Sequence, residues 1–285
     1  SEMCIRDRIY IDGKEGTTGL QIYERLGGRD DLELLLIDED KRKDTEERRK
    51  FLNAADLVFL CLPDAAAVEA VSLIENGNTK VIDASTAHRT APGWVYGFPE
   101  LLPGQRQRIR FSKRVANPGC HASGFLSIAA PLVKLGVLPP DYPVTCFSIT
   151  GYSGGGKEMI AEFQASDRDP ALAAPSLYAL GLDHSHLNEM QHIAGLDHPP
   201  VFTPILSDMY SGMSTSVPLQ NHLLRGRPTA EDVCEMMMAG ATAVEVGAAN
   251  LRDPYACKTI VEQLPRVCEQ LGAARIAELT GAAHR

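Results

Sequence analysis

The regular alternation of short apolar strands with helices over residues 9–83 constrains this chain more than any other feature. Strand-like runs cover 9–12, 32–37, 56–63 and 80–83, helical patterns occupy 20–26 and 65–74, and a charged stretch lies at 38–50. The run at 32–37 is nearly all apolar, as expected where both faces of a strand are covered. Strands separated by helices in this order predict an α/β fold with a doubly wound parallel sheet of the Rossmann type.

A glycine-punctuated turn, GKEGTTG, joins the first strand to the first helix. Its glycines are Gly13, Gly16 and Gly19. Glycines at such a turn leave backbone N–H groups and a helix N-terminus open to a pyrophosphate. A tight turn between a strand and a helix also favours glycine, so the motif alone is weak. Its place in the first βαβ unit favours dinucleotide binding.

The residues after the second strand leave the choice between NAD and NADP open. Asp38 ends that strand, where a carboxylate can hydrogen-bond the 2′-hydroxyl of a ribose and favour NAD. Lys41, Arg42 and Lys43 follow directly and could hold a 2′-phosphate instead. A solvated, charged turn without a ligand is the third interpretation.

The chain changes character after residue 119. A helix at 123–135, a strand at 144–150, a glycine-rich loop at 151–156 and a strand at 201–206 predict a second, α+β domain. We expect a nucleotide-binding domain at 9–119, a catalytic domain at 120–225 and a further α/β segment at 226–285. Residues 1–8 fit no periodic pattern, and we expect them to be an extraneous extension.

The segment NPGCHAS, residues 117–123, contains the candidate nucleophile. Pro118 and Gly119 end an extended stretch, so Cys120 is expected to open a helix. The helix dipole and the free N–H groups there would lower the pKa of its thiol and would stabilise an oxyanion on an attacked carbonyl. The alternative is a small buried cysteine at a helix start, an interpretation that suits Cys61 and Cys146.

The segment HSHLNE offers a base and a carboxylate to orient it. His184 and His186 are the candidate acid/base residues, and Glu189 is expected to reach back from a helix towards either of them. Two histidines at this spacing could also form half a metal site, but no further cluster has ligand spacing, so we predict no metal. The remaining histidines outside the cysteine motif are expected to be structural or exposed: His88, His192, His198, His222 and His284.

Composition narrows the class of protein. Among 285 residues, 44% are hydrophobic and the formal net charge is −9, which argues against a nucleic-acid partner or an anionic membrane surface. No apolar run approaches the ~20 residues that span a bilayer. The seven cysteines show no CxxC pair and no metal-ligand spacing. These features indicate reduced thiols in a cytoplasmic enzyme with a small-molecule substrate.

Residues 9 to about 225 resemble the short form of the N-acetyl-γ-glutamyl-phosphate reductases. The stretches that carry the resemblance are IDGKEGTTGLQI, NAADLVFLCLPDAAA, VIDASTAHRT, GWVYGFPEL, NPGCHAS, TGYSGGGK and the HSHLNE segment. They occur in the order found in that family and cover most of the span. The related semialdehyde dehydrogenases share the architecture but not this set of motifs.

The resemblance implies NADPH-dependent reduction of N-acetyl-glutamyl 5-phosphate to the 5-semialdehyde, with release of phosphate, in arginine biosynthesis. It implies that Cys120 forms a thioester, that His184 is the acid/base, and that His186 and Glu189 support the site. It also implies NADP(H) as cofactor and a homo-oligomer, a dimer or a tetramer.

The resemblance further implies two groups of binding residues. Cofactor contacts are expected from Gly13, Gly16, Thr17, Thr18, Gly19, Ser85, Thr86, Gly154 and Gly155. Substrate contacts are expected from Arg89, Asn117, Ser153 and Lys157.

The last 60 residues depart from this family, whose members normally end in a strand and a glycine-rich helix of the type GKGASGAA. The segment containing MAGATAVEVGAAN resembles instead the C-terminus of class 1 dihydroorotate dehydrogenases, with a strand expected at 243–246. We therefore expect a chimera joined at 226–233, the alternative being a divergent reductase tail. A related semialdehyde dehydrogenase, a cysteine hydrolase and a catalytically impaired fusion product stay open as functions.

Overall fold

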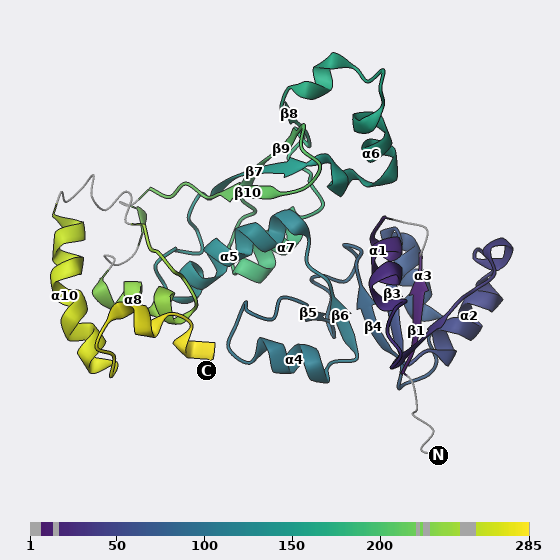
Figure 1. Ribbon diagram of the computed structural model, residues 1–285, viewed down its shortest axis with the longest axis horizontal. Helices are drawn as coiled ribbons and strands as arrows, with labels where there is room; N and C mark the ends of the chain where they lie inside the picture. Colours follow the sequence, from purple (N-terminus) through teal and green to yellow (C-terminus); the bar gives the residue numbers. More distant parts are fainter. Residues whose placement is uncertain (1–6, 14–16, 221–222, 225–228, 246–254, 285) are drawn as a thin grey trace. The chain divides into compact units, whose positions relative to one another are not determined.

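The computed structural model describes residues 7–13, 17–220, 223–224, 229–245 and 255–284. Contacts group the chain into two units, Ser1–Val133 with Pro143–Val217 and Lys134–Tyr142 with Pro218–Arg285. The first unit contains both sheets of the structure (Figure 1). No helix within the described ranges is long and apolar enough to cross a membrane.

The first sheet is parallel throughout and has the strand order β2-β1-β3-β4-β6-β5. Its strands are β1 (Asp7–Asp12), β2 (Leu32–Leu35), β3 (Leu57–Leu60), β4 (Lys80–Asp83), β5 (Val95–Tyr96) and β6 (Arg114–Ala116). The helices between them are α1 (Thr17–Leu26), α2 (Thr45–Ala54), α3 (Asp64–Ser72) and α4 (Gln105–Phe111). The predicted doubly wound sheet is confirmed, and its carboxyl-terminal edge faces the loops that build the site.

Two features of this domain differ from the sequence prediction. β1 begins at Asp7, because Asp7 and Arg8 pair with β2, and the Arg8 backbone N–H donates to Asp56 Oδ2 at 2.8 Å. The extension predicted at 1–8 therefore includes two residues of the fold, while residues 1–6 lie outside the described ranges. The charged stretch contains the start of α2, where the Asp44 side chain caps the helix by accepting hydrogen bonds from the backbone N–H groups of Glu46 and Glu47.

A compact apolar core holds the first sheet against α2 and α3. Its buried members are Tyr10, Leu52, Ala55, Val58, Leu60, Ala67, Ala70, Leu73 and Val81. Beside this core, Arg48 of α2 donates to Asp12 Oδ2 at 2.9 Å, and both side chains are buried. This buried ion pair ties α2 to the end of β1, next to Gly13, the first glycine of the turn.

The second sheet has the order β10-β7-β9-β8. Its strands are β7 (Thr145–Gly151), β8 (Ser176–Leu177), β9 (Val201–Ser207) and β10 (Met213–Ser216), with β7 and β9 parallel and the outer pairs antiparallel. Three helices accompany it: α5 (Cys120–Lys134), α6 (Gly156–Gln164) and α7 (Leu187–Ala194). α5 begins at Cys120, which confirms that this cysteine opens a helix and extends the helix predicted at 123–135 by three residues. Figure 1 shows α5 and α7 close to one another below this sheet.

The second unit is helical in the ranges that the structure describes. α8 (Ala230–Met238) begins with a capping box between Thr229 and Asp232, and α10 (Ala256–Gln270) packs against it. Cys234, Ile260 and Cys268 lie in the core between them. The strand predicted at 243–246 does not form at 243–245, and residue 246 lies outside the described ranges.

Candidate active site

Cys120 is the first residue of α5 and is exposed at the surface. The protein packed around the thiol nevertheless desolvates it and raises its pKa. The backbone amides of Cys120 and His121 at the start of α5, together with the positive charge of Arg89, oppose this rise. The prediction that the helix start lowers the pKa of this thiol is therefore wrong in net direction, because desolvation outweighs the favourable contacts.

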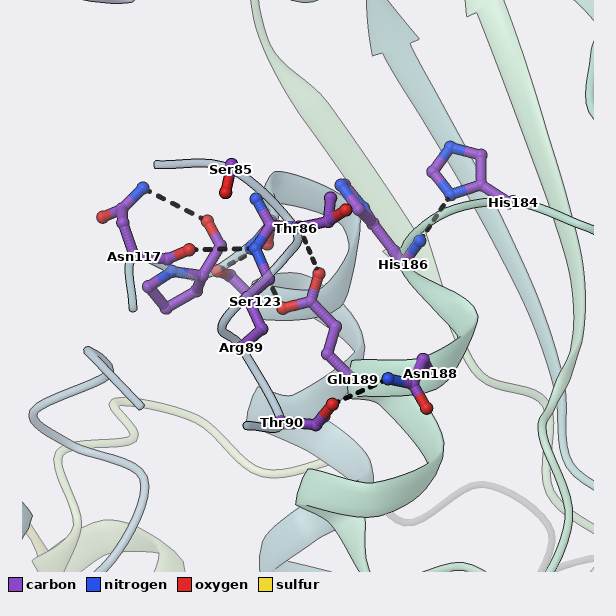
Figure 2. Close-up of polar contacts among 12 residues, drawn as sticks. Ser85, Thr86, Arg89, Thr90, Asn117, Ser123, His184, His186, Asn188 and Glu189 are labelled. Atoms are coloured by element: carbon purple, nitrogen blue, oxygen red, sulfur yellow. Dashed lines mark hydrogen bonds and ion pairs between the residues drawn. The ribbon is translucent and has the colours of Figure 1, made fainter. Parts of the chain in front are cut away.

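Glu189 holds the loop in front of Cys120. This carboxylate of α7 is 1% exposed, and its Oε1 accepts from Arg89 Nη1 at 2.6 Å (Figure 2). Its Oε2 accepts from Tyr96 Oη at 2.6 Å and from the Gly119 backbone N–H at 3.1 Å. Burial and the neighbouring carboxylate raise the pKa of Tyr96, so its hydroxyl remains a donor. Both oxygens of the buried charge are thus satisfied.

Gly119 allows this convergence. A Cβ on Gly119 would lie 2.5 Å from His186 Nε2 and 2.7 Å from Arg89 Nη1, and it would also clash with Glu189 Oε1. No side chain fits among these groups, because real Cβ contacts are never that short. The glycine before Cys120 is therefore required for the close approach of the imidazole, the guanidinium and the carboxylate.

Histidine rings cluster beside this loop. The ring centroids of His184 and His186 are 4.7 Å apart, and His121 lies 5.5 Å from His184 and 5.7 Å from His186. Burial is the main cause that lowers the pKa of all these rings, to about 3 for His186 and about 4 for His121. The cluster is accordingly uncharged at neutral pH.

The structure corrects the expected role of Glu189 toward the histidines. Its hydrogen bonds go to Arg89, Tyr96 and Gly119, and within the described ranges none joins it to His184 or His186. His184 is oriented instead by a local contact, since its Nδ1 accepts from the His186 backbone N–H at 3.1 Å (Figure 2). His186 Nδ1 is buried and has no hydrogen-bond partner among the described residues.

The loop after β4 brings Arg89 to the site. Arg89 Nε donates to the Asn117 carbonyl at 3.0 Å and Nη2 to the Ala84 carbonyl at 3.3 Å. The Asn117 amide donates to the Pro118 carbonyl at 3.3 Å. Arg89, which was expected to bind substrate, has its guanidinium engaged by the protein on all three nitrogens and is 8% exposed.

Polar contacts, most of them buried, fix the start of the same loop. Asp83 accepts from the Ser85 backbone N–H at 2.9 Å and from Ser85 Oγ at 2.7 Å, and lies 2.6 Å from His88 Nδ1. The Thr86 N–H donates to Asp64 Oδ1 at 2.9 Å. Ser85 is buried, and its hydroxyl donates to Asp83 rather than pointing to a ligand.

A cavity of about 470 Å³ brings together residues that the sequence placed in separate motifs. Its walls are Thr18, Gln21, Cys61, Leu62, Ala84, Ser153, Gly154, Gly155 and Gly156. Thr18, Ser153, Gly154 and Gly155 were expected at the site, and the structure does bring them together. Lys157 does not line this cavity and is exposed in the first turn of α6.

A second cavity, of about 520 Å³, lies at the carboxyl-terminal end of β1 and β2. Its lining includes Gly13, Glu39, Arg42, Lys43 and Arg48. Gly13 has a φ of +88°, and a Cβ there would collide with the Cys61 carbonyl, so this position requires glycine. Gly19 is buried in α1, Thr17 begins that helix, and Gly16 lies outside the described ranges.

These two cavities fit a dinucleotide with a 2′-phosphate. Gly13 lines the cavity of about 520 Å³ and Thr18 lines the cavity of about 470 Å³, so the glycine turn has a cavity at each of its two ends. Arg42 and Lys43 line the second cavity, whereas Lys41 forms an ion pair with Asp38 at 3.4 Å. Arg42 and Lys43 therefore face this space together with Glu39, whereas Asp38 does not line it. No group of three or more His, Cys, Asp or Glu side chains in the described ranges is arranged to hold a metal ion.

Tyr96, His121 and Tyr178 belong to the site but were not singled out in the sequence. His121 was visible only as the neighbour of Cys120 in the NPGCHAS motif. Tyr96 lies in the GWVYGFPEL stretch but was given no role there, Tyr178 lies in none of the motifs, and only the fold brings them to Glu189 and His121. A local sequence pattern carries no signal for such contacts, because the partners are 93 and 57 residues apart.

Comparison with protein families identifies both domains. Residues 18–109 match the semialdehyde dehydrogenase NAD-binding domain, and residues 120–261 match the semialdehyde dehydrogenase dimerisation domain. The second match continues through 226–233, where we expected a junction. None of the comparisons supports the resemblance to dihydroorotate dehydrogenase, so the expected chimera has no support.

Curated relatives match most of the chain. An N-acetyl-gamma-glutamyl-phosphate reductase of Trichormus variabilis is 45% identical over 256 residues, which is 87% of this chain and 79% of the relative. N-acetyl-gamma-glutamyl-phosphate reductase 2 of Pseudomonas putida is 47% identical over 87% of this chain and 82% of its own length. The reductase of Chelativorans is 50% identical over 79% and 72%.

Solved structures show the same fold at low sequence identity. Aspartate semialdehyde dehydrogenase II of Vibrio cholerae, complexed with ASA, gives a TM-score of 0.57 at 16% identity, covering 81% of this chain and 78% of that one. Aspartate semialdehyde dehydrogenase of Candida albicans, with NADP, gives a TM-score of 0.55 at 15% identity, covering 87% and 79%.

Proposed function

The chain belongs to the N-acetyl-gamma-glutamyl-phosphate reductase family, and from this we propose that it reduces N-acetyl-glutamyl 5-phosphate to N-acetylglutamate 5-semialdehyde and phosphate with NADPH. This reaction belongs to arginine biosynthesis. The observation that supports it most strongly is the position of Cys120 at the start of α5, beside the histidine cluster and the loop held by Glu189. A cysteine hydrolase would need no dinucleotide site, whereas the cavities at the glycine turn fit a dinucleotide.

We propose Cys120 as the nucleophile. Its thiolate attacks the carbonyl carbon of the acyl phosphate. The bond from that carbon to the phosphate oxygen breaks, phosphate departs, and the acyl group remains bound to Cys120 as a thioester. NADPH, when bound, supplies the hydride that reduces this acyl group to the aldehyde. The backbone N–H groups in the first turn of α5, at Cys120 and His121, would stabilise negative charge on the attacked carbonyl oxygen.

His184 is suited to donate a proton. Its Nδ1 accepts the His186 backbone N–H, so the neutral ring carries its hydrogen on Nε2. A ring in this tautomer stabilises an oxyanion by donation from Nε2 and returns to the same state when the aldehyde forms. His186 and Glu189 are positioning residues in this scheme, since they pack around Gly119 and fix the loop before Cys120.

The cofactor is proposed to lie along the glycine turn. Gly13, Thr18 and the backbone at 153–156 border the cavities that would hold it, and Arg42 and Lys43 would contact a 2′-phosphate. Gly16, Thr17 and Gly19 complete the turn, and Ser85 and Thr86 stay as proposed neighbours of the cofactor. Arg89, Asn117, Ser153 and Lys157 stay as proposed neighbours of the substrate, with Arg89 acting through Glu189.

The test runs the reaction backward. Purified protein is incubated with N-acetylglutamate semialdehyde, phosphate and NADP⁺, and formation of NADPH is followed by absorbance. We expect phosphate-dependent reduction that falls at least about a thousand-fold in Cys120→Ser. Aspartate semialdehyde as the better substrate would favour a related semialdehyde dehydrogenase. Full activity in the Cys120→Ser variant would refute the thioester mechanism.

We also propose a cytoplasmic homo-oligomer, a dimer or tetramer. The match to a dimerisation domain supports this, as does the apolar outer face of the second sheet, where Phe147, Ile149, Leu177 and Val201 are exposed. Sedimentation of Phe147→Asp is expected to show dissociation. We place the domain boundaries at 119/120, between β6 and α5, and at 225/226.

A further inference from the structure

His121 is anchored at both ring nitrogens. Its Nδ1 lies 2.7 Å from Ser148 Oγ of β7, and its Nε2 lies 2.8 Å from Tyr178 Oη. Ser148 Oγ lies in turn 3.2 Å from Thr215 Oγ1 of β10. A neutral imidazole has one donor and one acceptor, and hydroxyl groups can supply either role. The ring is therefore fully satisfied while 3% exposed.

The surroundings of this ring keep it from acting as an acid or a base. The Phe202 ring centroid is 5.2 Å away, and the ring also touches the other histidines of the site. Burial, together with His184, lowers the pKa of His121 to about 4. At neutral pH the side chain thus stays uncharged and holds its position without exchanging protons.

The same residue follows the candidate nucleophile in the first turn of α5. Its backbone amide is the largest of the effects that oppose the rise in the pKa of the Cys120 thiol caused by burial. Because the ring belongs to this first turn, fixing the ring restrains the turn that carries Cys120. The titratable or charged groups that face the two residues from other elements are Arg89, Tyr178, His184, His186 and Glu189.

The charge of the Cys120 thiolate also affects the anchoring hydroxyl of Tyr178. Burial first and then the negative charge of ionised Cys120 raise the pKa of Tyr178 to about 12, so its proton is retained. The second sheet is thereby connected to the first turn of α5 through protonated, uncharged groups.

We propose that His121 is a positioning residue for Cys120: its ring, fixed between Ser148 and Tyr178, holds the first turn of α5 in place, and with it the thiol of the preceding residue. The proposal rests on the proposed function only in naming Cys120 as the nucleophile. It predicts that loss of the ring contacts raises the pH at which the Cys120 thiol ionises, even though no atom of the Cys120 side chain changes.

The test measures the thiolate directly. Cys120 is alkylated with iodoacetamide from pH 6 to 10, and the rate is followed by mass spectrometry of the peptide that contains it, with Cys120→Ser as the blank. In His121→Phe we expect the midpoint to rise by about one pH unit and the rate at pH 7 to fall about tenfold. His121→Asn, which can still contact Ser148, is expected to fall about threefold or less.

Ser148→Ala tests the anchor without changing α5. It removes one ring contact and is expected to raise the midpoint in the same direction, by less than His121→Phe. The matched control is Thr79→Val, which removes another buried hydroxyl, whose hydrogen bond goes to the Ala55 carbonyl at 2.8 Å in the first domain. This control should leave the Cys120 profile unchanged.

The proposal is overturned if His121→Phe and Ser148→Ala keep the parental midpoint, or if Thr79→Val shifts it equally. Should His121→Phe not fold, Ser148→Ala and His121→Asn decide the matter. Alkylation needs neither substrate nor cofactor, so a failed reductase assay leaves this test intact. An unchanged alkylation profile, conversely, leaves the proposed reaction standing.

Discussion

Replacing Glu189 by glutamine tests whether this carboxylate holds the site together. The side chain is 1% exposed and accepts three hydrogen bonds, from Arg89, Tyr96 and Gly119. Glutamine has nearly the same shape but replaces one accepting oxygen by an NH₂ group, so at least one contact becomes donor against donor. It also leaves the guanidinium of Arg89, which is 8% exposed, without its counter-charge.

The expected cost follows from this burial. Removing one partner of a buried ion pair costs about 3–5 kcal/mol, and glutamine keeps one acceptor, so we expect a loss of about 3 kcal/mol in the free energy of unfolding. The reductase rate should fall as well, since the set of contacts that holds Arg89 and Gly119 in front of Cys120 is no longer complete.

Urea unfolding measured by tryptophan fluorescence reports this loss. Trp94 is the only tryptophan of the chain, and its ring stacks on His88 at 4.1 Å, in the same unit as Glu189. The matched control is Glu100→Gln, which breaks an exposed ion pair with Arg106 and should cost under about 1 kcal/mol. If Glu189→Gln costs no more than this control, the reasoning about its buried charge is refuted.

Three further results are expected. Gly119→Ala should lower the reductase rate at least about a hundred-fold with little change in the KM for NADPH, because its Cβ displaces the groups around Cys120 rather than the cofactor cavities; a near-parental rate would contradict the crowding. Arg42→Ala combined with Lys43→Ala should raise the KM for NADPH about tenfold or more, which corresponds to a loss of about 1.4 kcal/mol or more of binding free energy, and should leave the KM for NADH unchanged. Equal effects on both cofactors would exclude a 2′-phosphate contact. The pKa of His121 is held at about 4 in the fold against 6.5 in the unfolded chain, so the unfolded state binds more protons and stability falls as the pH drops below about 6.5. Between pH 7 and 5 this histidine should account for about 2 kcal/mol of lost stability, which urea titrations of His121→Phe at both pH values should lack.

Much of the first domain could be predicted from its hydrophobic pattern. The strands at 32–35, 57–60 and 80–83 lie within the predicted runs, because each carries the apolar residues that a parallel sheet packs against its helices. β2 is nevertheless an edge strand with no fully buried residue. α2 was missed because its stretch is dominated by charged side chains and buries few of its residues. The Asp44 cap before it was a usable signal, but the hydrophobic periodicity that defines most helices was weak.

The C-terminal segment, residues 226–285, shows how a local sequence pattern can predict the wrong structure. The apolar segment at 243–246 predicted a strand, yet residues 243–245 form no regular structure, and the neighbouring chain is helical. A strand forms only where a partner strand supplies the other half of its hydrogen bonds, and that partner cannot be read from the segment itself.

The sequence alone determined the order of strands and helices, the glycine turn and the chemistry offered by Cys120, His184 and His186, because these depend on short-range spacing and residue type. Only the tertiary structure decided the partners. It placed Glu189 on Arg89 and Tyr96 rather than on a histidine, fixed His121 between Ser148 and Tyr178, and raised the pKa of the Cys120 thiol. Hydrogen bonds between distant residues and desolvation depend on what surrounds a group in space, and no local pattern in the chain encodes that environment.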